Sequence, residues 1–547
     1  MGDQDHREGK SLLQLAEDHF KTSSWTPAEK RLLDEVHKGK QIYFRDDNRK
    51  LNAPRTSNSW GEERSVGAKL LEWLCTDKAA QKHVHRRGIR IAGVKVEGRL
   101  DLESAEVPFA IELTRCALTG SLDMWGATLR GLSLSRSEVR AVRAGGARIE
   151  TNLVLNNGFV SHSEVRLVGA KIKGDLVCSN ARLNGEHGRA LTCDRMEVSG
   201  SVFLKGRFEA SGEVRMVGAS VQGSIECDNG RFRNPSGVAL NCDGIRVQGD
   251  VYLRGGLSAD GVVTLAGASI LGWLFWTDIE QPQSAVLDLR GAQVGTLVDD
   301  DGSWPESGNL YLDGFHYDHI ADQAPMVHPL RLEWLRRQPV PKRTGLSRIM
   351  SRRKEYLFSP QPYEQAAKVL RGVGHDRASR KIQIAKNWSY SRHGDLFWLT
   401  KLARLLLLGP FIGFGFRPGR ALGIGLLLAA IGWGLFHVAG REDLVQMRGK
   451  DGALVARTEA SRQGERANYE PPDFHPLLYS LDVFLPVLSL GQEKAWSLNP
   501  RLTGHLIWDL DVSGFVLGAY AWGLNVIGWL SVSLFIAGAT GVVSRRL

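Results

Sequence analysis

The chain has 547 residues and carries 70 Lys and Arg against 60 Asp and Glu, a formal net charge of +10. This length allows about three domains. None of the six cysteines forms a C-x-x-C pair, which excludes the common zinc and dithiol redox motifs, and we expect the thiols to be reduced and buried. The first ten residues, MGDQDHREGK, have no apolar core, so we expect no signal peptide.

Residues 1–88 are predicted to form a helical cap. In SWTPAEKRLLDEVHKG, Thr26 is suited to an N-cap and Pro27 to the first helical position. A second apolar stripe lies in GEERSVGAKLLEWLCT. Because a stack of repeats needs a cap at its end, we expect these helices to close the segment that follows.

Residues 89–325 carry a repeat. Closely similar segments begin at Val165, Val214 and Val263, each 49 residues after the last, and a finer apolar-x-Gly-x-apolar unit recurs inside them. Its slots are Gly98, Gly120, Thr151, Gly174, Gly200, Gly223, Gly249 and Gly272. The period also admits a leucine-rich repeat, but the residues alternate with period two and show no helical period, which favours strands. We therefore predict a right-handed β-helix solenoid of about nine coils.

Two further features of the repeat have a physical interpretation. We expect its glycines to turn the corners of the coils, where a positive φ suits a residue without Cβ. Cys178 recurs as Cys227, and Cys193 as Cys242, which is typical of an interior ladder. After the repeat, His316, Asp318 and His319 are of metal-ligand type, but only the first two share a strand face, so we predict no metal site.

Residues 326–400 are predicted to be a basic helical connector. Between residues 331 and 354, nine basic side chains stand against one acid, Glu333. Such a block suits an anionic lipid surface, and a solvated linker is the alternative. We expect no nucleic-acid partner. The candidate ligands of lipid headgroups are Arg336, Arg337, Lys342, Arg343, Arg352, Arg353 and Lys354.

Residues 401–547 are predicted to be an α-helical membrane module with two transmembrane helices. Residues 421–440 and 514–543 are long and apolar enough to span a bilayer, whereas 402–416 is short, broken by Gly409 and Pro410, and read as interfacial. Arginines precede the first span and follow the second. By the positive-inside rule, both chain ends and the β-helix are expected in the cytoplasm.

Between the spans, residues 474–490 are apolar but short. Asp482 and Pro486 interrupt the segment. It is either a re-entrant helix, which enters and leaves the bilayer on one side, or an amphipathic helix lying on the membrane. If the segment is immersed, Asp482 becomes a functional candidate, because acids are rare in lipid.

The repeat and the connector resemble a known group of proteins. GVKVEGRLDLE, EVRLVGAKIKGDLVCSNARL and GDVYLRGG, followed by YEQAAKVLRGVGHDRASRKIQIAK, resemble bacterial membrane-anchored β-helix proteins related to pentapeptide-repeat solenoids and often labelled membrane-associated oxidoreductases. The resemblance covers roughly residues 25–547. It implies a bacterial inner-membrane location and an oxidoreductase activity.

The C-terminal third resembles the two-span pore domain of ion channels. GFGFRPGRALGIGLLLAAIGWGLF, FHPLLYSLDVFLPVLSLG and GLNVIGWLSVSLFIAGATGVV follow the order of outer helix, pore helix with filter, and inner helix. The potassium filter T-V-G-Y-G is replaced by Ser489, Leu490, Gly491 and Gln492, so the resemblance does not imply potassium selectivity. The candidate pore residues are Asp482, Ser489, Gly491 and Gln492.

Three functional hypotheses follow. The first is a β-helix that binds an unknown ligand or protein and is coupled to a channel-like module, which must be a homo-oligomer because two spans cannot enclose a pore. The second is a membrane-anchored scaffold without transport. The third is the oxidoreductase that the family label implies, although no dinucleotide-binding, nucleophile-elbow, Walker or metalloprotease motif is found, and we expect no catalytic residue and no cofactor.

Overall fold

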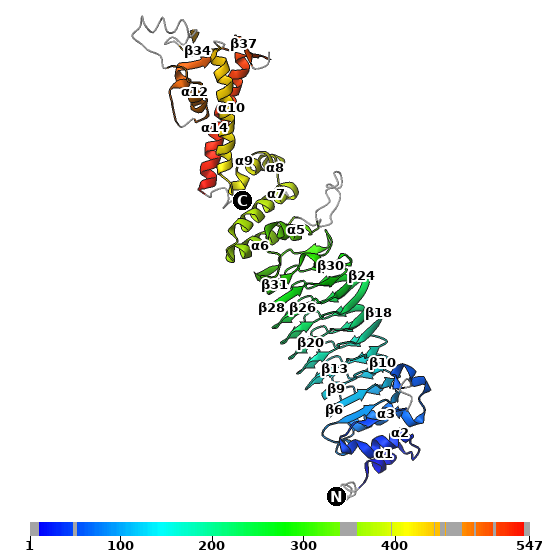
Figure 1. Ribbon diagram of the computed structural model, residues 1–547. Helices are drawn as coiled ribbons and strands as arrows, with labels where there is room; N and C mark the ends of the chain where they lie inside the picture. The colour runs from blue at the N-terminus through cyan, green and yellow to red at the C-terminus, as the bar shows by residue number, and fades with distance from the viewer. Residues whose placement is uncertain are drawn as a thin grey trace. The chain divides into compact units, whose positions relative to one another are not determined.

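The computed structural model describes residues 10–46, 52–339, 358–394, 396–441, 444–448, 454–455, 473–485, 488–506 and 510–540. These form two compact units, Met1–Ile382 and Gln383–Leu547. The first holds a β-solenoid and the helices at its two ends, and the second holds the long apolar helices (Figure 1). Each unit has its own hydrophobic core.

The solenoid has about ten turns and is built from two parallel sheets. The sheet of 17 strands contains β1 (Ile42–Tyr43), β3 (Ile89–Ala92), β6 (Glu106–Thr114), β9 (Thr128–Ser133), β12 (Arg148–Ile149), β13 (Leu153–Val154), β16 (Lys171–Ile172), β17 (Leu176–Val177), β19 (Glu197–Val198), β20 (Val202–Phe203), β22 (Ser220–Val221), β23 (Ile225–Glu226), β25 (Arg246–Val247), β26 (Val251–Leu253), β28 (Ser269–Trp276), β31 (Gln293–Asp299) and β33 (His316–Ile320).

The second sheet has 16 strands. It contains β2 (Ser65–Gly67), β4 (Lys95–Glu97), β5 (Leu100–Asp101), β7 (Ala117–Leu118), β8 (Leu122–Asp123), β10 (Glu138–Val139), β11 (Val142–Arg143), β14 (Val160–Ser161), β15 (Val165–Arg166), β18 (Arg182–Thr192), β21 (Glu209–Arg215), β24 (Arg231–Asn241), β27 (Leu257–Thr264), β29 (Ile279–Glu280), β30 (Ala285–Asp288) and β32 (Leu310–Tyr311).

The parallel register stacks equivalent residues of successive coils. Leu176, Val202, Ile225, Val251 and Leu274 pair in sequence along the stack, and all five are buried. Each coil therefore hides its apolar row only against the coils on either side of it, which is the stabilising principle of a solenoid. The 49-residue repeat of the sequence corresponds to two such coils.

The cysteines lie inside this ladder, as predicted. Cys178 and Cys227 are fully buried, with Leu204 from the intervening coil between them in the stack. Burial raises the pKa of the Cys178 thiol to about 12 and that of Cys242 to about 12 as well. A neutral thiol in this setting acts as a small hydrophobic side chain.

The prediction that the repeat glycines turn the corners of the coils with a positive φ was wrong at most of their positions. Among these residues only Gly98 has a positive φ, of 96°. Gly200 and Gly223 instead lie against the coil before them, where a Cβ would approach the carbonyl oxygens of Gly174 and Gly200 to 2.8 and 2.7 Å. Glycine is needed there because stacked backbones come too close for a side chain. The left-handed corners lie elsewhere, for example at Gly169, with φ of 65°.

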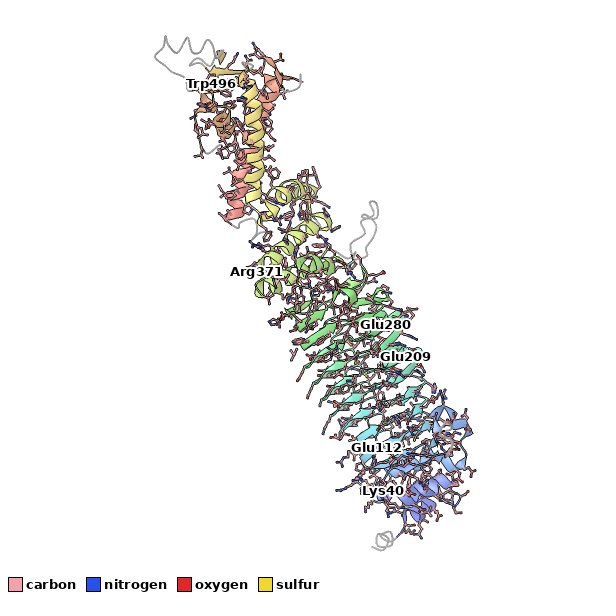
Figure 2. All side chains as sticks on the ribbon, in the orientation of Figure 1. Lys40, Glu112, Glu209, Glu280, Arg371 and Trp496 are labelled. Carbon is pink, nitrogen blue, oxygen red and sulfur yellow. The ribbon has the colours of Figure 1, made fainter. Side chains whose placement is uncertain are left out.

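The outer surface of the coils carries ion pairs between neighbouring turns. Glu209 contacts both Arg182 and Arg233, and Glu112 pairs with Arg90 at 2.9 Å. Figure 2 labels Glu112 and Glu209 on different coils of the stack. These groups lie at the surface and are partly exposed to solvent, so each pair is expected to contribute at most about 1 kcal/mol.

The N-terminal end is covered by helices. They are α1 (Leu12–Phe20), α2 (Pro27–Glu35), α3 (Ala68–Thr76) and α4 (Lys78–Gln81), with the 3₁₀ turns η1 (Val36–Lys38), η3 (Pro54–Ser59) and η4 (Glu62–Arg64). Thr26 caps α2 in a capping box with Glu29, and its hydroxyl donates to the Ser65 carbonyl at 2.7 Å. The cap also supplies β1 and β2, which begin the two sheets.

The other end of the stack is closed by α5 (His328–Arg336) and α6 (Gln361–Gly372), after the 3₁₀ turns η5 (Pro282–Ser284) and η6 (Asp301–Ser303). The amides of Gln361 and Gln365 donate to the carbonyls of Phe315 and Tyr317, which are groups of the last coil that no further strand covers. Arg331 of α5 is fully buried and binds Asp299 through two hydrogen bonds of 2.9 and 3.0 Å.

The second unit begins within α7 (Asp376–His393). It continues with α8 (Trp398–Ala403), the π-turn η8 (Arg404–Leu408), α9 (Gly409–Ile412), the 3₁₀ turn η9 (Gly413–Gly415), α10 (Gly419–Arg441), β34 (Val445–Arg448), β35 (Leu454–Val455), α12 (Pro476–Phe484), α13 (Gln492–Ala495), β36 (Trp496–Leu498), β37 (Thr503–Leu506), β38 (Leu510–Ser513) and α14 (Gly514–Ala539). Trp496 of β36, labelled in Figure 2, packs against Phe474 with ring centroids 5.6 Å apart.

Three helical segments of this unit are long and apolar enough to cross a membrane. They are Trp398–Gly415, Gly419–Arg441 and Gly514–Ala537. The second and third correspond to the two predicted spans. The first covers the segment predicted to be interfacial, so the count of two spans is not confirmed by length and composition.

Candidate functional site

The short helix α12 lies against both long helices, α10 and α14, which also pack against each other. The Ser480 hydroxyl donates to the Ala429 carbonyl of α10 at 2.6 Å. The Tyr520 hydroxyl of α14 donates to the Leu428 carbonyl of α10 at 2.7 Å. Each hydroxyl donates a hydrogen bond to a backbone carbonyl of α10, so the three helices are joined by polar contacts as well as by apolar packing.

Two glycines allow this close packing. A Cβ on Gly528 of α14 would lie 1.9 Å from the Phe484 carbonyl oxygen, and one on Gly425 of α10 would lie 2.3 Å from the Phe484 ring. Phe484, the last residue of α12, is fully buried between them. Small residues on the long helices therefore form the space that the end of α12 fills.

Asp482 holds the loop that follows α12. Its side chain is buried, and its two carboxylate oxygens accept hydrogen bonds from the backbone N–H groups of Leu490 at 2.6 Å and Glu493 at 2.8 Å. Because two backbone donors satisfy its charge, the carboxylate is stable inside an apolar unit. Asp482 is thus a residue that positions the loop.

The other three candidate residues have different roles in the same loop. Gln492 is buried. Its Oε1 accepts a hydrogen bond from the His475 N–H at 3.1 Å, and its Nε2 donates one to the Asp473 carbonyl at 3.0 Å. These two bonds connect the end of the loop to the start of α12. Gly491 has a φ of 84°, a left-handed conformation that favours glycine. Ser489 is exposed.

The arrangement therefore presents one short segment at the surface of a single chain. Leu488 and Leu490 are 58% and 44% exposed, on either side of Ser489. The segment is fixed at its far end by Asp482 and Gln492, and no side chain of the described neighbourhood covers it.

The long helices also expose apolar faces. Leu427 and Ile431 of α10 are 63% and 48% exposed, and Trp522 and Trp529 of α14 are 75% and 54% exposed. Large apolar surfaces of this kind mark contact with lipid or with another protein.

The candidate lipid ligands are only partly described. Arg336, at the end of α5, is exposed, whereas Arg337 donates to the carbonyls of Trp304 and Pro305 and to Glu333. The candidates between residues 340 and 357, which are Lys342, Arg343, Arg352, Arg353 and Lys354, lie outside the described residues. Arg331, in the same basic block, is buried in the ion pair with Asp299.

The structure adds residues that the sequence did not single out. Ser480, Gly425 and Gly528 position α12, and only the small size of the glycines within apolar runs was a signal for them. Within the described parts of the chain, no group of three or more His, Cys, Asp or Glu residues could hold a metal ion. His316 of β33 is exposed and its Nδ1 contacts the Gly314 carbonyl at 2.7 Å.

Comparison with known proteins gives one short match. The family described as low-density lipoprotein receptor repeat class B matches residues 272–307. This segment covers a small part of the chain, and its strands β28 and β31 pair in parallel as part of the continuing solenoid. No curated protein and no solved structure matches the chain.

Proposed function

We propose that the chain is a bacterial inner-membrane protein in which a cytoplasmic β-solenoid is coupled to a channel-like module, assembled as a homo-oligomer. The observation that carries this proposal is α12, a short helix held between α10 and α14 with its following loop fixed by Asp482. The order of long helix, short helix, fixed loop and long helix is that of a two-span pore domain.

Two membrane spans, α10 and α14, are favoured over three. The segment Trp398–Gly415 changes from α to π geometry at Arg404 and turns left-handed at Gly413 and Phe414, with φ of 54° and 57°. The Arg404 guanidinium, within this segment, is bound to Ser391 and Asn387 of the polar helix α7 at 3.0 and 3.1 Å. An arginine at the bilayer centre costs about 3 kcal/mol or more, so a segment whose arginine is held by a polar helix belongs at the interface.

A re-entrant position is favoured for α12. A helix lying on the membrane surface would contact at most the ends of the spans. Instead, Tyr479 and Val483 are buried in one cluster with Ala429 and Leu524 of the two long helices. The buried Asp482 is compatible with immersion because its charge is satisfied by backbone donors.

The proposal predicts that Ser489 lines the conducting path. The full-length protein carrying Ser489→Cys is reconstituted in liposomes, and ion flux is measured before and after treatment with a charged methanethiosulfonate reagent. The six native cysteines are all buried, so the reagent acts on the introduced thiol. We expect flux in the untreated variant and its loss on treatment.

The matched control is Leu427→Cys, which places an exposed thiol on the outer face of α10. Treatment of this variant is expected to leave flux unchanged. A strictly monomeric particle in detergent with no flux in liposomes would refute the pore, because two spans from one chain cannot enclose one.

A membrane-anchored binding scaffold without transport is the second candidate function. The apolar residues on either side of Ser489, Leu488 and Leu490, favour it, since they offer no polar lining. A chain lacking residues 399–547 that keeps its partner-dependent function would support the scaffold. The oxidoreductase activity implied by the resemblance stays a prediction, which absorbance of the purified protein for flavin, haem or iron–sulfur groups would test.

A further inference from the structure

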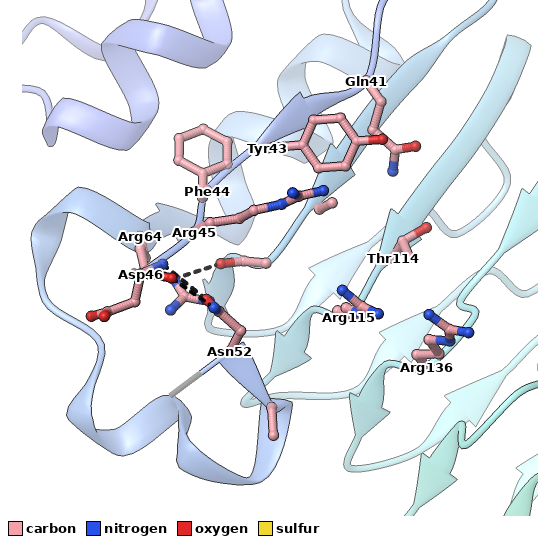
Figure 3. Close-up of a pocket in the computed structure, with 13 residues that line it drawn as sticks. Gln41, Tyr43, Phe44, Arg45, Asp46, Asn52, Arg64, Thr114, Arg115 and Arg136 are labelled. Carbon is pink, nitrogen blue, oxygen red and sulfur yellow. Dashed lines mark hydrogen bonds between the residues drawn. The ribbon is translucent and has the colours of Figure 1, made fainter. Parts of the chain in front are cut away.

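A polar pocket of about 860 Å³ lies at the N-terminal end of the solenoid, far along the chain from the membrane helices. It is lined by residues of the segment around β1, by the corner after β6 and by the corner of the next coil. Figure 3 shows Tyr43, Arg45, Thr114, Arg115 and Arg136 lying around the same opening. Its volume is within the range of pockets that bind small organic molecules.

One corner of the stack at this pocket has no side chain, which lets the backbone of Phe44 approach it closely. Gly93 occupies the corner after β3, with φ of 85°, and a Cβ there would lie 2.2 Å from the Phe44 carbonyl oxygen. The corners of the next two coils carry Arg115 and Arg136, stacked through backbone hydrogen bonds. The pocket is lined by Arg45, from the segment around β1, and by the two stacked arginines.

The pocket carries an excess of positive charge. Arg64, at its wall, donates to the Gly93 carbonyl at 2.9 Å, and the nearby Asp46 offsets its charge. Within the described residues, Arg45, Arg115 and Arg136 form no ion pair; Arg45 lies over the Tyr43 ring at 4.2 Å. Three guanidinium groups that have no ion-pair partner in the described part of the chain thus line one pocket, and each can donate two parallel hydrogen bonds to an oxyanion.

The backbone at the two stacked arginines is unusual for their residue type. Arg115 and Arg136 have φ of 53° and 57°, a left-handed conformation that is unfavourable for most residues. The equivalent corners of later coils use Asn157 and Asn180, and asparagine adopts this conformation readily. Arginine is therefore not the residue type that the turn itself favours at this position.

We propose that this pocket binds a small soluble diphosphate, whose phosphate groups lie between Arg45 and the stacked pair Arg115 and Arg136. Adjacent coils are about 4.8 Å apart, so the two stacked guanidinium groups can reach neighbouring oxygens of one ligand. A diphosphate carries about three negative charges near neutral pH, which matches these three arginines. The aromatic ring of Tyr43, which is 45% exposed, offers a surface for an organic group attached to the phosphates.

Isothermal titration calorimetry of the full-length protein in detergent tests the proposal, with pyrophosphate as the probe and sodium chloride at equal ionic strength as the blank. The informative variant is Arg115→Asn with Arg136→Asn, because asparagine suits both corners. We expect saturable binding by the wild type and a Kd at least about tenfold weaker in the double variant, since charge-assisted hydrogen bonds are lost. Unchanged reactivity of the buried cysteines shows that the double variant is folded.

Arg195→Asn is the matched control, because Arg195 has the same left-handed φ, of 54°, and is not among the residues that line the pocket. We expect it to bind pyrophosphate as the wild type does. Three results would each overturn the proposal. The wild type does not bind pyrophosphate, the double variant binds it as tightly as the wild type, or the double variant and the control lose affinity for it equally. Glycerol 3-phosphate, which represents a lipid headgroup, is expected to bind more weakly; tighter binding than pyrophosphate would reject a soluble diphosphate as the ligand.

Discussion

The buried ion pair between Arg331 and Asp299 gives a sharp prediction on the stability of the solenoid. Both side chains are almost fully buried, with exposures of 0% and 2%, and two hydrogen bonds join them. The Trp304 indole N–H also donates to Asp299 at 2.8 Å. Burial by itself lowers the pKa of Arg331, but the charge and hydrogen bonds of Asp299 outweigh it, so the pKa is raised and the guanidinium stays charged.

Replacement of Arg331 by methionine keeps the volume of the side chain's stem but leaves the buried carboxylate of Asp299 with the Trp304 indole as its side-chain donor among the described residues. Breaking one side of such a pair costs about 3–5 kcal/mol. In the double variant Asp299→Asn with Arg331→Met, no charge is buried, and the asparagine oxygen still accepts from Trp304. We therefore expect the second substitution to restore part of the stability that the first removes.

The assay uses labelling of the cysteines to report unfolding of the first unit. All six are buried, and all lie before residue 383, so a maleimide dye reacts only when that unit opens. Dye fluorescence during denaturation of the full-length protein in detergent gives its free energy of unfolding. Arg182→Met is the control, because Arg182 is 62% exposed in its pair with Glu209, and a loss of at most about 1 kcal/mol is expected.

Two results would refute the reasoning. One is a free energy of unfolding for Arg331→Met within about 1 kcal/mol of the wild-type value, which would mean that the ion pair contributes little to the stability of the first unit. The other is a double variant less stable than Arg331→Met alone, which would show that the uncompensated carboxylate is not the source of the loss.

Three further predictions concern other parts of the molecule. Gly528→Ala forces a Cβ against the Phe484 carbonyl and is expected to destabilise the helical unit by about 1–3 kcal/mol, measured by protease resistance in liposomes. Gly518→Ala, with open space around it, is the control, and equal resistance of the two variants would contradict the packing. Asp482→Asn leaves one backbone N–H of the loop without its acceptor, at a cost of about 1–3 kcal/mol, and should slow ion flux; flux equal to that of the wild type would show that the loop needs no such anchor. The pKa of Cys178 is raised by burial from 9.0 to about 12, so its contribution to stability is complete below pH 9 and is lost as the pH rises from 9 towards 12, by about 1 kcal/mol per pH unit. The unfolding midpoint of the first unit should therefore be lower at pH 10 than at pH 8, and identical midpoints would count against a buried neutral thiol.

Local patterns in the sequence were enough to predict the solenoid and the apolar helices. The recurrence of Cys178 as Cys227 indicated an interior ladder, and the structure places both in the stack. Thr26 and Pro27 marked a helix start that the structure has. Such features depend on period, hydrophobicity and capping, which neighbouring residues determine among themselves. Asp482 was also singled out from the sequence, because an acid within an apolar run is visible without a structure.

What these residues do was decided by contacts between segments far apart in the chain. The sequence could not distinguish a glycine needed for positive φ from Gly200, which is needed because two coils approach closely. It could not separate Arg331, in the core, from the exposed Arg336 beside it in one basic block. Nor could it show that Arg45 and Arg136 lie around one opening. The fold class follows from a periodic sequence because each coil needs only its neighbours, whereas a site needs distances between side chains, and only the stacking of the coils and the packing of the helices sets those distances.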